Sequence, residues 1–130
     1  MIERLTPEDI REIHEVMLER YGGLNGENEP GLIDFMADKP FDGFGNMEYY
    51  PGFFMKAAVY MEGFCVHQLF CDGNKRTGFT CAATFLELNG YSLMISDDEL
   101  YNVSLKVANK QIDLEALAIW IEENSVPSKD

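Results

Sequence analysis

The sequence has few cysteines, few basic residues and no long hydrophobic run. Its three cysteines, Cys65, Cys71 and Cys81, are odd in number and stand among apolar neighbours. We therefore expect reduced thiols in a cytoplasmic protein, and neither a disulfide framework nor a zinc site. No segment offers about 18 uninterrupted apolar residues, so no membrane-spanning helix is expected. The first residues, Met1–Leu5, lack the apolar core of a secretory signal peptide.

Basic residues are scarce, with 10 Lys and Arg against 23 Asp and Glu and a formal net charge of −13. This charge disfavours nonspecific binding to DNA, RNA or acidic membranes. An acidic surface suits a basic partner, although more often it only keeps a protein soluble. The length of 130 residues and the hydrophobic content of 46% predict a single folded domain over residues 1–130.

Apolar residues recur at helical spacing through most of the chain, which predicts an all-α fold. Thr6 is a good N-cap, Pro7 suits the first helical position, and Gly22 ends the helix that they begin. The segment 41–51 is expected to be a loop or a small hairpin, and the tail from Ser125 is expected to be frayed. The spacing predicts about six helices, over residues 7–21, 31–38, 53–69, about 75–88 and 96–108, and from Asp113 onward.

The segment Phe70–Thr77 combines an acid, a glycine, an amide and two adjacent cations at the start of an apolar helix. Free backbone amides at a helix N-terminus, together with Lys75 and Arg76, are what a phosphate group requires. Gly73 allows the backbone to approach a ligand closely, and Asn74 either caps the helix or hydrogen-bonds a phosphate. The pattern therefore indicates a nucleotide-phosphate site.

Asp72 adds a metal ion to this prediction. A carboxylate would repel a bare phosphate, so its presence argues for a bridging cation such as Mg²⁺. The alternative is an ordinary Asp-Gly-Asn turn followed by a solvated basic first turn. That alternative is weakened because cations at a helix N-terminus oppose the helix dipole, at a cost of roughly a few tenths of a kcal/mol, unless an anion is bound.

The same segment resembles the Fic/Doc family, and in particular its Doc (death-on-curing) branch of toxin–antitoxin toxins. The family pattern H-x-F-x-D/E-G/A-N-G/K-R is matched in register by Phe70, Asp72, Gly73, Asn74, Lys75 and Arg76. Doc-like sequence also occurs, in the expected order, at residues 14–15, 21–23, 31–33, 50–51, 56–58 and 85–91. The resemblance extends over about residues 5–123.

The resemblance implies a compact helical bundle of about six helices with a small flap loop or hairpin, here residues 41–51, which would align a target segment. It implies binding of ATP and Mg²⁺ in the cytoplasm. The Doc branch is similar to a protein kinase in outcome, because it transfers the terminal phosphoryl group to a hydroxyl of a translation elongation factor and so inhibits translation. The expected partners are that protein and an antitoxin protein, with no direct nucleic acid and no membrane.

The resemblance also assigns roles to individual residues. The implied cofactor-binding residues are Gly73, Asn74, Lys75 and Arg76, and the implied metal ligand is Asp72. The implied catalytic residues are Gln68, Asp72 and Arg76. Because Lys75 fills space that AMP-transferring relatives leave free, adenylyl transfer to a protein is the less favoured activity.

Gln68 departs from the family pattern, which has a catalytic histidine at this position. In the family, that histidine takes the proton from the attacking hydroxyl, and such help accelerates a reaction by about 10²–10⁴-fold. A glutamine amide can only hydrogen-bond and orient a hydroxyl. Two hypotheses therefore remain. The protein is either a toxin with impaired phosphoryl transfer, or an inactive pseudoenzyme that binds nucleotide or antitoxin. His67 is an alternative base, although one residue along a helix turns it by about 100°.

Other residues also allow two interpretations. His14 lies on the apolar stripe of the first helix. It is either a hydrogen-bonded core residue or a residue that contacts a bound ligand. Lys56 is expected to pair with a carboxylate and to have no catalytic role. The aromatic residues of the 41–51 segment either dock a target peptide or pin that segment to the bundle.

Overall fold

The computed structural model describes residues 2–29 and 31–128, and most of this part of the chain is helical. The all-α prediction is therefore confirmed. The helices are α1 (Pro7–Tyr21), α2 (Leu32–Asp38), α3 (Phe53–Val66), α4 (Asn74–Leu88), α5 (Asp97–Ala108) and α6 (Leu114–Glu123), with a 3₁₀ turn, η1 (Lys39–Phe41). Two antiparallel strand pairs join β1 (Gly43–Phe44) to β2 (Met47–Glu48), and β3 (Tyr91–Leu93) to β4 (Ser125–Pro127). None of the described helices combines the length and the apolar character needed to cross a bilayer.

Local capping determines where α1 begins and ends. The Thr6 hydroxyl accepts a hydrogen bond from the Asp9 amide at 3.1 Å, and the Asp9 carboxylate accepts one from the Thr6 amide at 2.9 Å. Pro7 lies in the first turn, where its missing N–H costs nothing. Gly22, with φ 79°, follows the last helical residue. Because these signals are adjacent in sequence, the predicted bounds of α1 agree with the structure.

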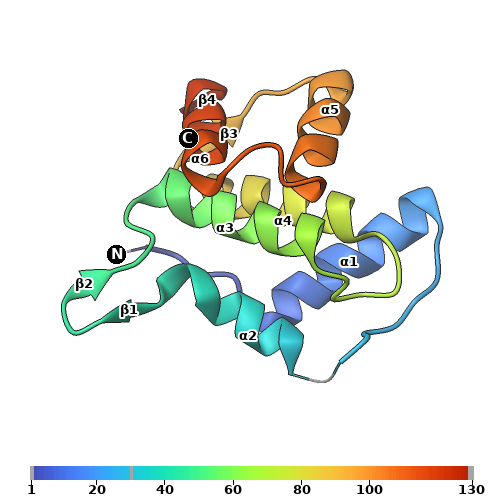
Figure 1. The fold of residues 1–130 in the computed structure, drawn as a ribbon. Helices are drawn as coiled ribbons and strands as arrows, with labels where there is room; N and C mark the ends of the chain where they lie inside the picture. The colour runs from blue at the N-terminus through green and yellow to red at the C-terminus, as the bar shows by residue number, and fades with distance from the viewer. Residues whose placement is uncertain (1, 30, 129–130) are drawn as a thin grey trace.

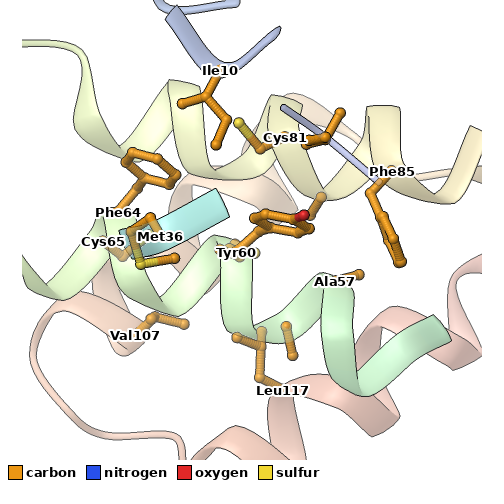
Figure 2. Packing of buried hydrophobic residues seen from close by; sticks show 14 of the residues in the cluster. Ile10, Met36, Ala57, Tyr60, Phe64, Cys65, Cys81, Phe85, Val107 and Leu117 are labelled. Atoms are coloured by element: carbon orange, nitrogen blue, oxygen red, sulfur yellow. The ribbon is translucent and has the colours of Figure 1, made fainter. Parts of the chain in front are cut away.

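The central helix of the bundle is α3. It packs against α4, α5 and α6, and α1 and α2 lie on the side away from α5 and α6 (Figure 1). Figure 2 shows Tyr60 and Phe64 of α3 directed into the hydrophobic core, to which α4 contributes Phe85. A Cβ added at Gly78 of α4 would come within 2.8 Å of the Phe64 Cβ. The absence of a side chain at Gly78 therefore allows these two helices to approach closely.

The segment 41–51 forms the small hairpin of β1 and β2, in which Gly43 pairs with Glu48. The Lys56 side chain is fully buried, and its ammonium group donates a hydrogen bond to the Glu48 carboxylate at 2.6 Å. The pairing expected for Lys56 is thus present, and it ties the hairpin to the first turn of α3. At about 1.5 Å per residue, the 14 residues of α3 span about 21 Å. The hairpin therefore lies at the opposite end of α3 from Phe70–Thr77 (Figure 1).

The prediction that the chain frays from Ser125 is wrong for the described residues. Ser125–Pro127 pairs as β4 with β3, so that Ser92 lies opposite Val126. The Ser128 amide extends this pairing by donating to the Gly90 carbonyl at 2.9 Å. Residues 129–130 lie outside the described residues. A short polar tail gives no sequence signal for such pairing, because its partner strand is more than thirty residues away in the chain.

Candidate functional site

A cavity of about 910 Å³ lies at the N-terminal end of α4, where α1 and α5 also contribute to its walls. The structure brings every predicted site residue to this cavity, namely Gln68, Asp72, Gly73, Asn74, Lys75 and Arg76. The hairpin of β1 and β2 contributes none of the described lining residues. The predicted flap exists as a hairpin, and its role in aligning a target stays a prediction.

The turn that opens α4 leaves the helix N-terminus uncapped by any described side chain. Its N-cap residue is Gly73, which has φ 78° and ψ 16°, the left-handed conformation that glycine adopts without strain. The first helical hydrogen bond is donated by the Thr77 amide to the Gly73 carbonyl at 3.0 Å. The three amides before Thr77 are consequently available to an anion, which the helix dipole also favours.

Asp72 is fixed by two contacts with the α1 region. Its carboxylate Oδ2 accepts a hydrogen bond from the Leu24 amide at 2.7 Å, and its backbone carbonyl is 2.7 Å from His14 Nε2. His14 is buried and stacks on the Phe70 ring, with the ring centroids 3.7 Å apart. The structure therefore favours the interpretation of His14 as a hydrogen-bonded core residue over that of a ligand.

The Asp72 carboxylate fits a magnesium ion that arrives with a nucleotide. Among the described residues, only its Oδ2 accepts a hydrogen bond, so Oδ1 is left for a ligand. Those residues contain no group of three or more His, Cys, Asp or Glu side chains arranged to hold a metal. Mg²⁺ commonly takes only one or two protein carboxylates and completes its shell with phosphate oxygens and water. One carboxylate beside an anion-binding helix end meets this requirement.

The Asn74 side chain lines the cavity but is engaged by the turn itself. Its Oδ1 accepts a hydrogen bond from the Phe70 amide at 2.9 Å, and its Nδ2 donates to the Phe70 carbonyl at 2.9 Å and to Gln68 Oε1 at 3.2 Å. The expectation that this side chain caps α4 or binds a phosphate therefore does not match its contacts. The Asn74 backbone amide, in the first turn of α4, is the group that could face an anion.

A segment after α1, Gly22–Asn28, lies along the turn; we call it the strap. The Asn28 amide donates to the Leu69 carbonyl at 3.0 Å, and the Cys71 amide donates to the Gly26 carbonyl at 2.9 Å. This pairing explains why α3 ends at Val66 and does not continue to residue 69 as predicted. From the sequence, Gly22 and Gly23 marked only the end of a helix, and these contacts were not predicted.

The strap is anchored to α1 by an ion pair. Arg11 donates two hydrogen bonds to the Glu27 carboxylate, at 2.8 and 3.3 Å. The hydrogen bond from Arg11 holds the pKa of Glu27 below its usual range. Glu27 also forms an isolated β-bridge with Phe70. The ion pair thus fixes the strap residue that lies opposite the turn.

Asn28 is expected to hold the turn in place. Its Nδ2 donates to the Gln68 carbonyl at 2.6 Å and to the Phe70 carbonyl at 3.3 Å. Replacing Asn28 by Ala removes both hydrogen bonds. We therefore expect the free energy of unfolding, measured with urea, to fall by about 1–3 kcal/mol. Asn102, exposed on α5, supplies the matched control, and Asn102→Ala should change this free energy by less than about 0.5 kcal/mol. An equal effect of both substitutions would show that Asn28 does not hold the turn in place.

The cavity gathers cations that are rare elsewhere in this acidic chain. Arg20, Lys75 and Arg76 line it, and they are three of the ten Lys and Arg residues. The Arg76 guanidinium lies over the Tyr21 ring, 4.0 Å from its centroid. This cation–π contact holds the guanidinium at the cavity rim while leaving its N–H groups for an anion.

The far wall of the cavity has a different character. Phe79 of α4 and the Leu100 and Tyr101 side chains of α5 supply apolar and aromatic surface. Asp97 and Asp98, at the start of α5, add two carboxylates. A ligand that fills this cavity would therefore combine an anionic part near α4 with a flat or apolar part near α5.

His67 does not join Gln68 at the cavity. It lines a separate hollow of about 590 Å³, whose walls include Glu62 of α3 and Lys110 after α5. The alternative in which His67 replaces the missing base is therefore not supported by the geometry.

The cysteines agree with the expectation of free thiols. Cys65 and Cys81 are buried and Cys71 is exposed, and none forms a disulfide. Burial raises the pKa of the Cys65 thiol to about 11, so this side chain stays neutral near physiological pH. Cys71 lines the cavity, and its Sγ lies 3.4 Å from Asn28 Oδ1, which places it in the contact between turn and strap.

Comparison with known proteins adds a family and two relatives. The model of the Fic/DOC family matches residues 4–86, which include the strap and the whole turn. The chain is 29% identical to "Toxin Doc" of Mycolicibacterium smegmatis (strain ATCC 700084 / mc(2)155) over 120 residues, covering 91% of this chain and 90% of that protein. It is 28% identical to "Protein kinase doc" of Escherichia phage P1 over 114 residues, covering 88% and 89% of the two chains.

Proposed function

Because the chain belongs to the Fic/DOC family, we propose that it is a Doc-like toxin of a toxin–antitoxin system. In this proposal it binds ATP with Mg²⁺ in the cavity and transfers the terminal phosphoryl group to a hydroxyl of a translation factor in the cytoplasm. Transfer is slow because Gln68 stands where the family has its catalytic histidine. The names of the two relatives described above, a Doc toxin and the protein kinase doc, support this class of function.

The observation that carries the proposal is the uncapped N-terminus of α4 opening into a cavity with three cations. Backbone amides, Lys75 and Arg76 would hold the phosphate oxygens, and Arg76 can hold two of them at once. Asp72, oriented by the Leu24 amide, would hold the magnesium ion. When bound, Mg²⁺ neutralises phosphate charge. The wall of Leu100 and Tyr101 offers a surface for the nucleoside.

The residues of the turn would position the reactants but supply little base catalysis. The hydroxyl oxygen of the target forms a bond to the terminal phosphorus, the bond from that phosphorus to ADP breaks, and the hydroxyl proton leaves to solvent. The Gln68 amide has no basicity for this proton. Phosphoryl transfer depends mainly on positioning and charge neutralisation, so a slow reaction remains possible.

A pseudoenzyme that binds nucleotide or antitoxin is the second candidate, and Gln68 is the observation that favours it. In either case the expected partner is an antitoxin that covers apolar surface at the cavity. Tyr21 is 57% exposed, Leu24 72% and Tyr101 65%, and Tyr21 and Tyr101 line the cavity itself. Adenylyl transfer is the third candidate, and it is disfavoured because the resemblance implies that Lys75 fills space which AMP-transferring relatives leave free.

Labelled ATP separates the three candidates. The intact chain is incubated with Mg²⁺ and a bacterial translation extract, and ATP carries the label on either the terminal or the alpha phosphate. We expect slow labelling of one protein from the terminal phosphate alone. Labelling from the alpha phosphate would indicate adenylyl transfer, and ATP binding without any labelling would indicate the pseudoenzyme. Failure to bind ATP would refute the proposed function.

A further inference from the structure

The contacts around Asn74 determine which way the Gln68 amide faces. The Phe70 amide can only donate a hydrogen bond, so the Asn74 atom 2.9 Å from it must be the oxygen. The other end of this side chain is then the NH₂ group, and both of its hydrogens are used, by the Phe70 carbonyl and by Gln68. The Gln68 atom that receives this bond must therefore be its oxygen.

This arrangement leaves the Gln68 NH₂ group for a ligand. Oε1 accepts the hydrogen bond from Asn74, and Nε2 donates to none of the described residues. Gln68 is exposed and lines the cavity beside Lys75 and Arg76. Its backbone is held as well, because the Asn28 side chain donates to its carbonyl. Gln68 is thus a preorganised donor at the cavity.

We infer that Gln68 is a phosphate-binding residue, whose Nε2 donates to a phosphate oxygen of the bound nucleotide. The inference rests on the proposed function, since it assigns the group that Gln68 contacts in that site. A donor with no basicity strengthens binding of an anion and does not take up a proton. Gln68 would then strengthen nucleotide binding while it limits the rate of transfer.

Gln68→Glu tests the inference with little change in shape. A glutamate oxygen can still accept the bond from Asn74, while the donor that faces the cavity becomes a charged acceptor. We expect the Kd for MgATP, measured by calorimetry on the intact chain, to rise about tenfold or more. Gln68→Ala, which removes the donor without adding charge, should weaken binding several-fold by the same measurement.

Gln111→Glu is the matched control. Gln111 lines the separate hollow, so this variant adds the same charge outside the cavity and should keep the parent Kd within about twofold. If Gln68→Ala binds MgATP as tightly as the parent, or if Gln68→Glu does, the inference is overturned and the proposed function stands. If the parent itself does not bind MgATP, both are refuted.

Discussion

Gln68→His should increase phosphoryl transfer by about 10²–10⁴-fold, which is the usual contribution of a general base. The expectation follows from three features of the site: the anion-binding end of α4, the Asp72 carboxylate held by Leu24, and a position 68 that lines the same cavity. If position 68 is the one at which the family has histidine, an imidazole there can accept the proton of the attacking hydroxyl. The measurement compares the two chains for label transferred from the terminal phosphate and for growth arrest after induction in bacteria.

The pH dependence of transfer shows whether Gln68→His is faster because it supplies a general base or only because it binds its ligands more tightly. Imidazole accepts a proton only when it is neutral, so transfer by Gln68→His should rise as pH increases through the range in which histidine titrates. The parent lacks this group and should not show that rise. Gln111→His is the control, because it adds a histidine at the separate hollow and should leave transfer at the parent level. Equal transfer by the parent and Gln68→His would show that the catalytic role assigned to position 68 is wrong.

The helices could be predicted because their start signals are local. Thr6, Ser96 and Asp113 each accept a hydrogen bond from an amide three residues later, so each cap lies within a single turn of sequence. The predicted beginnings of these helices agree with the structure for this reason. The end of α3 could not be predicted in the same way. It is set by pairing with the strap, whose residue Asn28 is 40 residues away from Gln68 in the chain.

The candidate site shows the same division between local and distant information. The motif identified six of the residues that line the cavity, Gln68 and residues 72–76, and the structure brings these six together there. The lining residues of α1 and α5 were not predicted. The motif did not indicate that the Asn74 side chain faces Phe70 and Gln68, because an asparagine after glycine is equally suited to a cap or to a ligand contact. Nor did it indicate that Leu24 orients Asp72, since a backbone amide of a loop leaves no trace in the identity of its residue.

The hairpin illustrates a third case, in which the element was foreseen and its position was not. Glycine and aromatic residues in the segment 41–51 predicted a loop or hairpin. Its place is fixed by Lys56, which is buried in α3 and reaches the Glu48 carboxylate. A buried lysine requires such a partner, but the sequence alone did not identify which carboxylate it would be.

Phe70→Ala should cost about 3–5 kcal/mol of the free energy of unfolding, the usual loss for a buried phenylalanine. The side chain is 1% exposed and lies between His14 and Phe64, with ring centroids 3.7 and 6.0 Å away. The total stability of such a domain is roughly 5–15 kcal/mol, so this loss is a large fraction of it. Urea unfolding followed by circular dichroism measures the change.

The control for this substitution is Phe44→Ala. Phe44 is 80% exposed on the hairpin, so removing its ring should change the free energy of unfolding by less than about 0.5 kcal/mol. Phe70 also holds the turn through its backbone, because its amide donates a hydrogen bond to the Asn74 side chain and its carbonyl accepts one from it. Alanine keeps these backbone bonds, so the measured loss reports the buried ring alone. A cost of Phe70→Ala no larger than that of Phe44→Ala would show that the stack of His14 on Phe70 does not support the turn.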